Sequence, residues 1–251
     1  MEKEKQQTLN IGLVGYGRMG RLVEETIVKT HGVQCVGIVS PEHNSDLNQI
    51  SEKLDVIIDF SHPSNLAMIA SYAEKNATPV VFATTGYAAE QVDEIEHLAE
   101  KVPVIYTANF SLGITVFQQV LRQITPVLRD AFDIEIIEKH HKMKLDSPSG
   151  TAKMLLQAVE EGREYKKIYG REGFGKRGDE IGIHSVRGGT IAGEHTVLFA
   201  GEDEILEITH QAHSRQIFAT GAVLAAKFAA ERKFPGLYDM NDVLFKKEVT
   251  E

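Results

Sequence analysis

The chain has 251 residues and a net charge of −9, from 36 acidic and 27 basic side chains. This length allows one large core or two modest ones, and the acidic balance argues against nucleic acid as a partner. The single cysteine, Cys35, excludes a disulfide framework. The charged start MEKEKQQTLN and the lack of a bilayer-length apolar run lead us to expect a cytoplasmic protein that binds no membrane.

A glycine-rich turn follows the first apolar run. Residues 9–14 read as a strand, Gly15, Gly17 and Gly20 follow, and a helical pattern begins directly afterwards. Glycines at this spacing allow a tight turn and a close approach to a pyrophosphate, whose charge the amides and dipole of the helix start would favour. The stretch therefore predicts dinucleotide binding, with Arg18 as a further phosphate contact. The alternative is a merely tight turn.

Strands and helices alternate through the first 110 residues. Helical patterns at 65–76 and 89–101 separate further strand-like runs at 33–40, 54–61, 78–87 and 102–111. This alternation predicts an α/β fold with a Rossmann-type, doubly wound parallel sheet, whose ligands bind beyond the carboxyl ends of the strands. We expect four loops there to line one crevice: residues 15–20, 61–63, 83–86 and 107–110.

The end of the second strand bears on the choice of cofactor. A carboxylate there would bind the ribose hydroxyl of NAD, but the strand ends Val39-Ser40-Pro41, and Glu42 comes only afterwards. Rejection of a 2′-phosphate is thereby weakened, and a protonated His62 could face that phosphate. We therefore expect NADPH to be accepted, with NADH also possible.

The chain changes character near residue 110. Helical patterns cover residues 113–131 and 150–161. The remaining strand-like runs predict a mixed or antiparallel sheet, and they are residues 133–141, 180–189, 194–203 and 205–213. The glycine- and charge-rich stretch 162–182 is expected to be a mobile surface loop. A helical pattern after residue 221, with Val223, Leu224 and Phe228 on its apolar side, should pack the tail against the first domain. We place a dinucleotide-binding domain at 1–109 and 217–251, and an α+β domain for substrate binding and oligomerisation at 110–216.

The stretch EKHHKMKLDSPSGTA, residues 138–152, carries the densest set of reactive side chains. His140 and His141 follow a strand, and a helix is expected to begin near Ser149 or Gly150. The amides of that helix start and the Lys144 ammonium would grip a small carboxylate, and a histidine could donate a proton. The structural alternative is a helix cap, a glycine turn and a polar sheet edge.

Metal binding is a further rival interpretation of the ten histidines. His210 and His213 are three apart, but THQAH reads as a strand, in which residues three apart face opposite sides. No cysteine or carboxylate cluster supports them as ligands. We therefore expect no metal.

Seven motifs occur in a fixed order along almost the whole chain: GYGRMG, DVIIDFSHP, ATTGY, ANFSLG, EKHHKMKLDSPSGTA, VRGGTIAGEHTV and EITHQAHSR. In these motifs the sequence resembles the 4-hydroxy-tetrahydrodipicolinate reductase (dihydrodipicolinate reductase) family of bacterial lysine and diaminopimelate biosynthesis. The resemblance implies reduction of (2S,4S)-4-hydroxy-2,3,4,5-tetrahydrodipicolinate by NADPH or NADH, with loss of water, to (S)-2,3,4,5-tetrahydrodipicolinate. It also implies a homotetramer built through the sheet of the second domain.

The resemblance implies roles for individual residues as well. His140 would be the proton donor and Lys144 the second catalytic residue, and the dicarboxylate would be bound by His141, Gly150 and Thr151. The cofactor would contact Gly15, Tyr16, Gly17, Arg18, Met19, Gly20, Ala83, Thr84, Thr85, Thr107, Ala108, Asn109 and Phe110.

Some features depart from many relatives: a shorter first glycine loop, the run VSPEH, and His62 where arginine is common. These departures bear on the cofactor preference and not on the reaction. Two alternatives remain open. One is another NAD(P)-dependent small-molecule dehydrogenase on this scaffold, similar to 2,4-diaminopentanoate dehydrogenase, and the other is a non-catalytic NAD(P)-sensing protein.

Overall fold

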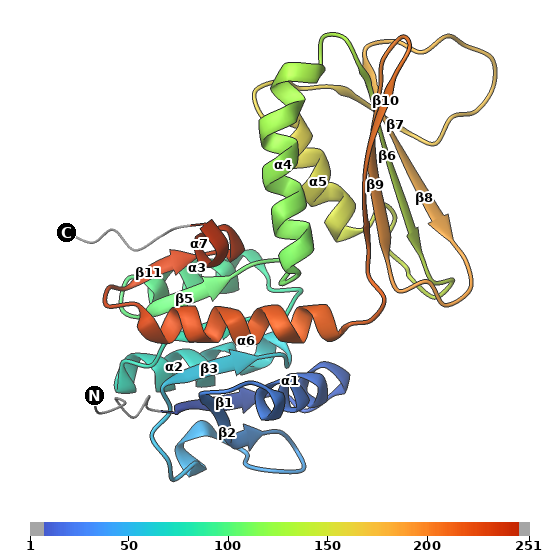
Figure 1. The fold of residues 1–251 in the computed structure, drawn as a ribbon. Coiled ribbons are helices and arrows are strands. Elements are labelled where there is room, and N and C mark those ends of the chain that lie inside the picture. The colour runs from blue at the N-terminus through green and yellow to red at the C-terminus, as the bar shows by residue number, and fades with distance from the viewer. Residues whose placement is uncertain (1–7, 246–251) are drawn as a thin grey trace, which may run out of the picture. The chain divides into compact units, whose positions relative to one another are not determined.

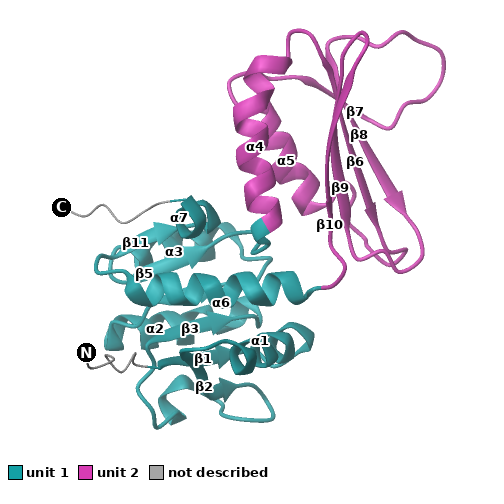
Figure 2. Ribbon diagram, in the orientation of Figure 1, with its two compact units in different colours: residues 1–112, 215–251 teal, residues 113–214 magenta. Residues whose placement is uncertain are grey.

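The computed structural model describes residues 8–245, which fall into two compact units (Figure 2). Unit 1 combines two separate parts of the chain, residues 1–112 and 215–251, and unit 2 is formed by residues 113–214 between them. Within the described range, no helix is long and apolar enough to span a bilayer.

Unit 1 contains a six-stranded sheet in which all neighbouring strands are parallel. The strand order is β11-β5-β4-β3-β1-β2, with β1 Leu9–Val14, β2 Val33–Val39, β3 Val56–Asp59, β4 Val80–Phe82, β5 Pro103–Tyr106 and β11 Gly236–Tyr238. The helices are α1 Arg18–Lys29, α2 Leu66–Asn76, α3 Ala89–Ala99, α6 Gln216–Glu231 and α7 Met240–Phe245, with 3-10 turns at Leu47–Gln49 (η1) and Pro63–Asn65 (η2). The predicted Rossmann-type sheet is confirmed.

Strands β3 and β4 in the middle of the unit 1 sheet are buried on both faces, and helices lie on each side of the sheet (Figure 1). In β3, Ile58 packs into one core with Val23 of α1, and its neighbour Ile57 packs into the other with Ile69 of α2. Because side chains alternate between the faces, a strand covered on both sides needs an unbroken apolar run such as Val56-Ile57-Ile58.

Helix α6 packs against the sheet of unit 1 through a face made mostly of alanine. Its fully buried residues include Ala219, Ala222, Ala225, Ala226 and Ala229. A Cβ on Gly221 would stand only 1.7 Å from the carbonyl oxygen of Phe110. These small residues let the helix backbone approach closely, and the expected return of the tail to the first domain is confirmed.

The sequence did not predict β11 or α7. β11 pairs in parallel with β5, with Leu237 opposite Val104. Three residues that include a glycine are too few to show a strand period, so this edge strand is specified by its neighbour and not by its own sequence.

Unit 2 is a five-stranded mixed sheet with two helices on one face (Figure 1). The order is β10-β9-β6-β8-β7, with β6 Asp133–His140, β7 Lys166–Tyr169, β8 Glu180–Arg187, β9 Glu194–Ala200 and β10 Ile205–Gln211. β6 runs antiparallel to β9 and parallel to β8. The helices are α4 Leu112–Leu128 and α5 Gly150–Glu160, whose apolar sides share a core with the strands. The predicted second domain with a mixed sheet is confirmed.

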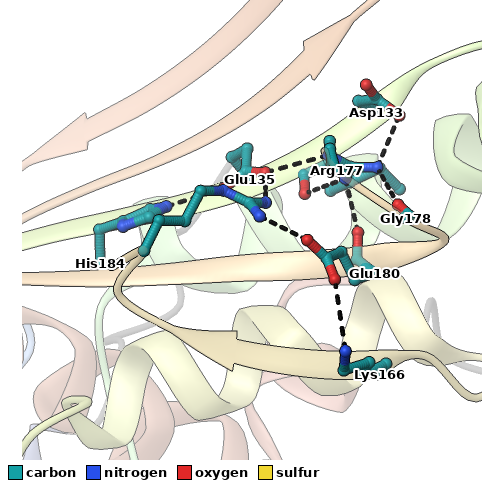
Figure 3. Close-up of polar contacts among 9 residues, drawn as sticks. Asp133, Glu135, Lys166, Arg177, Gly178, Glu180 and His184 are labelled. Carbon is teal, nitrogen blue, oxygen red and sulfur yellow. Dashed lines mark hydrogen bonds and ion pairs between the residues drawn. The ribbon is translucent and has the colours of Figure 1, made fainter. Parts of the chain in front are cut away.

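The expectation of a mobile loop over 162–182 is wrong for part of that stretch. Lys166–Tyr169 forms β7, which pairs in parallel with β8. After it, Arg171 and Arg177 both bind the carboxylate of Glu135 on β6, and Arg177 also binds Asp133 at 2.6 Å (Figure 3). Four strand residues within a charged, glycine-rich stretch give no readable period, and the arginine contacts join residues far apart in the chain.

Candidate active site

The buried row of β6 changes from apolar to polar at its carboxyl end. Ile136 faces the helices of unit 2, and the next two residues on that face are Glu138 and His140, both buried. Residues two apart share a face because strand side chains alternate. The strand register sets His140 opposite Arg187 of β8 and Glu138 opposite His195 of β9, so four polar side chains meet at one end of the sheet.

Glu138 is a fully buried carboxylate surrounded by donors. Arg187 donates a hydrogen bond of 2.7 Å to each carboxylate oxygen, and the backbone N–H of Ser149 donates to Oε1 at 3.1 Å. Burial raises the pKa of Glu138, but hydrogen bonds from Arg187, His140 and Ser185 outweigh it and lower that pKa to about 2. Glu138 is therefore ionised at neutral pH.

His140 is held by Glu138 through one ring nitrogen. Its Nδ1 lies 2.6 Å from Oε2 of Glu138, and because this carboxylate is ionised, Nδ1 carries a hydrogen and donates it. Burial lowers the pKa of His140 below its ordinary value, and the hydrogen bond to Glu138 opposes that shift. The proton that the imidazolium can release is consequently the one on Nε2.

Gly193, directly before β9, leaves room beside that nitrogen. A Cβ at this position would stand 3.1 Å from Nε2 of His140. A longer side chain would cover the nitrogen. The glycine of the stretch AGEHT therefore leaves this side of the His140 ring uncovered.

Helix α5 begins at the same corner of unit 2. Ser149 is its N-cap, with Oγ accepting from the N–H of Ala152 at 3.1 Å and lying 3.0 Å from Nε2 of His195. Burial lowers the pKa of His195 to about 3, so this ring is neutral, and its Nε2 shares a hydrogen bond with the Ser149 hydroxyl. The cap that the sequence offered as a structural alternative is present, and the hydroxyl of Ser149 is engaged within the protein.

Lys144 faces a carboxylate of its own chain. Its Nζ lies 2.7 Å from Oδ1 of Asp146. This contact, aided by the backbone N–H of Gly150, lowers the pKa of Asp146. One carboxylate is thus held by an ammonium and by an amide at the start of α5, which is the arrangement that a substrate carboxylate would require. The charge of Lys144 also lowers the pKa of His140.

The two other predicted substrate residues flank this corner. His141 follows His140 and is half-buried, and its carbonyl accepts the N–H of Lys144 at 3.1 Å. Thr151, also half-buried, follows Gly150 in the first turn of α5. The structure brings all five predicted catalytic and substrate residues to one corner of unit 2, and their roles stay predictions.

In unit 1, the glycine turn has the shape that a pyrophosphate needs. Gly15 has φ +92°, and a Cβ there would stand 2.4 Å from the carbonyl oxygen of Phe60. A Cβ on Gly20 would stand 2.2 Å from the Gly15 carbonyl oxygen, so both positions require glycine. Gly17 is the N-cap of α1, where no side chain among the described residues caps the helix and a Cβ would meet none of their atoms within 4 Å beyond its chain neighbours. The helix start thus offers amides and space to a phosphate.

Asp59 ties two of the carboxyl-end loops together. Its fully buried carboxylate accepts from the N–H of Ser61 at 3.1 Å and from the hydroxyl of Tyr87 at 2.9 Å. The N–H of Ser61 also donates to Oγ1 of Thr84 at 2.8 Å. Burial raises the pKa of Asp59, and these hydrogen bonds oppose the shift. The loops after β3 and β4 therefore lie side by side.

The other predicted cofactor residues differ in what their side chains can reach. Arg18, Thr85 and Ala108 are exposed, and those half-buried are Tyr16, Met19, Ala83 and Thr107. Thr84, Asn109 and Phe110 are buried: Thr84 binds Ser61, Asn109 accepts from the N–H of Ser111 at 2.8 Å, and Phe110 packs in the core. Any cofactor contact at these three residues would run mainly through the backbone.

Sequence reasoning gave no role to Arg187, His195, Gly193 or Asp59. The first three lie in the stretch VRGGTIAGEHTV, whose polar residues among glycines were a usable signal. Among residues 8–245, no group of three or more His, Cys, Asp or Glu side chains is placed to hold a metal ion.

A parallel sheet with a glycine turn before its first helix, and a mixed sheet with a histidine–carboxylate pair beside a second helix start, are features of one class: a nicotinamide-dependent oxidoreductase with a Rossmann-type domain. The comparisons narrow the class. Residues 9–110 match the N-terminal domain of dihydrodipicolinate reductase and residues 113–244 match its C-terminal domain. The chain belongs to the dihydrodipicolinate reductase family.

Relatives and solved structures agree with this placement. Proteins named 4-hydroxy-tetrahydrodipicolinate reductase from Exiguobacterium sp. (strain AT1b) and Caldanaerobacter subterraneus are 42% and 46% identical, covering 94% and 92% of this chain and 95% of each relative. A dipicolinate-bound dihydrodipicolinate reductase from Paenisporosarcina sp. TG-14 has a TM-score of 0.77 at 25% identity, covering 95% of this chain and 100% of that one. A diaminopimelate dehydrogenase from C. glutamicum shares the fold, with a TM-score of 0.56 at 12% identity over 93% of both chains.

Proposed function

We propose that this protein reduces (2S,4S)-4-hydroxy-2,3,4,5-tetrahydrodipicolinate to (S)-2,3,4,5-tetrahydrodipicolinate with NADPH or NADH and loss of water. The observation that carries the proposal is the corner of unit 2 where His140 is bonded to Glu138 and the Lys144 ammonium holds a carboxylate, that of Asp146, beside the start of α5. A reduction of this kind must add one hydride and one proton to a dicarboxylate. The corner can bind the carboxylate and supply the proton.

In this proposal each residue acts through a stated atom. Water leaves the substrate as its hydroxyl group and a proton from the adjacent carbon. After hydride addition, Nε2 of His140 gives its proton to that adjacent carbon, and Nδ1 stays bound to Glu138. Lys144 and the amides of Gly150 and Thr151 hold one substrate carboxylate, which takes the place of Asp146, and His141 contributes to binding the dicarboxylate. The bound relative from Paenisporosarcina, which holds dipicolinate, supports this substrate class.

The residues of unit 1 fit a nicotinamide cofactor. Gly15 and Gly20 form a turn that any Cβ would obstruct, and Gly17 begins α1 without a side-chain cap among the described residues. The pyrophosphate would lie against this helix start, and when bound, the nicotinamide supplies the hydride.

A coupled assay tests the proposed function. An upstream enzyme makes the unstable substrate in place, and the loss of NADPH or NADH is followed by absorbance. We expect turnover with both components present and none without substrate. Cofactor binding without turnover would favour the sensing alternative, and turnover with other substrates in a panel, but not with this one, would favour a different dehydrogenase.

We expect NADPH to bind at least as tightly as NADH. Glu42 lies 3.6 Å from Arg21, which stacks on Tyr16 at 4.4 Å, so the carboxylate after β2 is directed to an arginine. Both members of this pair are well exposed, and such pairs are weak enough for a phosphate to displace the carboxylate. His62 is less suited to the task, because its Nδ1 accepts the N–H of Ser64 at 3.2 Å and protonation there would break this contact.

Dissociation constants for both cofactors check this expectation. Arg21→Ala should weaken NADPH more than NADH, and Lys29→Ala, at the other end of α1, is the matched control. A preference for NADH above about tenfold, equal to about 1.4 kcal/mol, would mean that a carboxylate reaches the ribose after all.

We also expect four chains to assemble through the sheet of unit 2. The helices cover one face, and no described helix of unit 2 covers the other, on which Ile137, Leu198 and Ile205 lie. Ile205 is 67% exposed in the single chain. Such a face is stabilised by burial against further copies. Light scattering at micromolar protein should give a tetramer mass, and a monomer mass would refute the assembly.

A further inference from the structure

We propose that Glu138 and Arg187 are a pair of positioning residues that fix the tautomer of His140 and set the pH at which it becomes protonated. The inference rests on the proposed role of His140 as the proton donor. It assigns to the pair two opposing effects on one imidazole.

Glu138 fixes the orientation of the ring. Its ionised Oε2 requires a hydrogen on Nδ1 of His140, 2.6 Å away, in both the neutral and the charged imidazole. When His140 acts, the Nε2–H bond breaks, its electron pair stays on nitrogen, and the proton leaves to the substrate. The ring that remains is the neutral Nδ1–H tautomer, already bonded to Glu138, so neither the carboxylate nor the ring orientation needs to change.

Arg187 limits the charge that Glu138 presents to the ring. An unpartnered carboxylate this close would hold the imidazolium strongly and make it a poor acid. The guanidinium binds both oxygens at 2.7 Å and also donates to the carbonyl of Asp146 at 2.6 Å, which fixes its position. Glu138 therefore favours the protonated ring, and Arg187 disfavours it.

The other charged or titratable groups near His140 are few and come from each neighbouring segment. Lys144 in the following turn disfavours its protonation, and His195 on β9 stands edge-on with ring centroids 5.0 Å apart. His195 stays neutral at working pH because burial lowers its pKa to about 3. The start of α5 contributes Ser149, which is bonded to Glu138 and His195. Glu138 and Arg187 thus form an ion pair whose two charges have opposite effects on the protonation of the His140 ring.

The same strand offers a matched control on its opposite face. Glu135 also binds a histidine and arginines, with His184 Nε2 at 2.7 Å and Arg177 Nε at 3.2 Å. Figure 3 shows Glu135 between His184 and Arg177. Being three residues from Glu138 on a strand, it faces the other side of the sheet.

The test is a titration of the histidines of the full chain by NMR, with the His140 signal identified by its loss in His140→Gln. Glu138→Gln should lower the pKa of His140, and Arg187→Gln should raise it, each by about one pH unit or more, since a charge within about 4–6 Å shifts a pKa by about one to three. Glu135→Gln should leave His140 unchanged. The descending limb of kcat against pH should move with each variant.

If Glu138 and Arg187 only stabilised the fold, the two substitutions would not shift the pKa of His140 in opposite directions. Shifts of the same sign, or shifts no larger than that of Glu135→Gln, would overturn the proposal. If a variant fails to fold, the tautomer of His140 can still be tested in the unaltered protein. The nitrogen chemical shifts of the neutral ring should show a hydrogen on Nδ1, and a hydrogen on Nε2 would refute the assignment. The titration needs no substrate, so its outcome is separate from that of the turnover assay.

Discussion

Replacing His140 by glutamine should lower kcat about 100- to 10,000-fold with little change in KM, because a positioned general acid acts mainly in the transition state. Glutamine keeps a polar side chain of similar reach but has no proton to give. Steady-state kinetics in the coupled assay measure both constants. The loss of kcat should not be accompanied by a loss of cofactor affinity, because the glycine turn belongs to unit 1.

The role of His140 as a proton donor also predicts how the reaction rate changes with pH. The donor is active when protonated, and burial lowers the pKa of His140, so kcat/KM should fall as pH rises through a value below the ordinary one for histidine. A bound dicarboxylate favours the imidazolium, so the limb in kcat should lie at higher pH than the limb in kcat/KM. His140→Gln should abolish both limbs. If kcat stays unchanged, the donor is another residue, with His141 as the next candidate.

Replacing Lys144 by alanine should reduce kcat/KM by about 100- to 1,000-fold, since bound substrate would desolvate the ammonium and its carboxylate partner, and truncating one partner of such a pair costs several kcal/mol. The variant would also leave Asp146 without its 2.7 Å partner, so that this carboxylate would repel the incoming one. Cofactor affinity should stay nearly the same. Steady-state kinetics and direct binding of dipicolinate, which undergoes no turnover, distinguish a loss of substrate affinity from a loss of catalytic rate.

Two further variants make the Lys144 experiment decisive. Lys144→Arg keeps the charge but cannot release a proton near neutral pH. If it restores activity, the role is electrostatic; if it binds dipicolinate without turning over substrate, the lysine takes part in proton transfer. Asp146→Asn removes the competing carboxylate and should bind dipicolinate at least as tightly as the unaltered chain. Full activity in both Lys144 variants would contradict the anion-binding corner.

The sequence could predict the parts of the site that lie in continuous stretches. The glycine turn from Gly15 to Gly20 and the run from His140 to Thr151 each combine a strand end, a turn and a helix start, and such local patterns carry their own signals. The cap at Ser149 was foreseen for the same reason. Strands β1 to β5 of unit 1 were predictable because strands in the middle of a covered parallel sheet are rich in apolar residues.

The contacts that organise the site were not predictable, because they depend on strand register. Arg187 and Glu138 are 49 residues apart, and only the parallel pairing of β6 with β8 brings them together. The need for glycine at position 193 likewise arises from where His140 stands. A single sequence shows the polar residues of such a cluster but not which of them face one another.

The alanine face of α6 also affects the order in which the chain can fold. Synthesis proceeds from the N-terminus, so β1 to β5 emerge before the helix that buries one side of them and before β11 completes their sheet. The whole sequence of unit 2 emerges in between. Unit 2 can therefore complete its core first, contrary to the usual sequence in which the N-terminal domain folds first. A chain that stopped before Gln216 would retain the residues around His140 but lack the helix that closes the dinucleotide-binding unit.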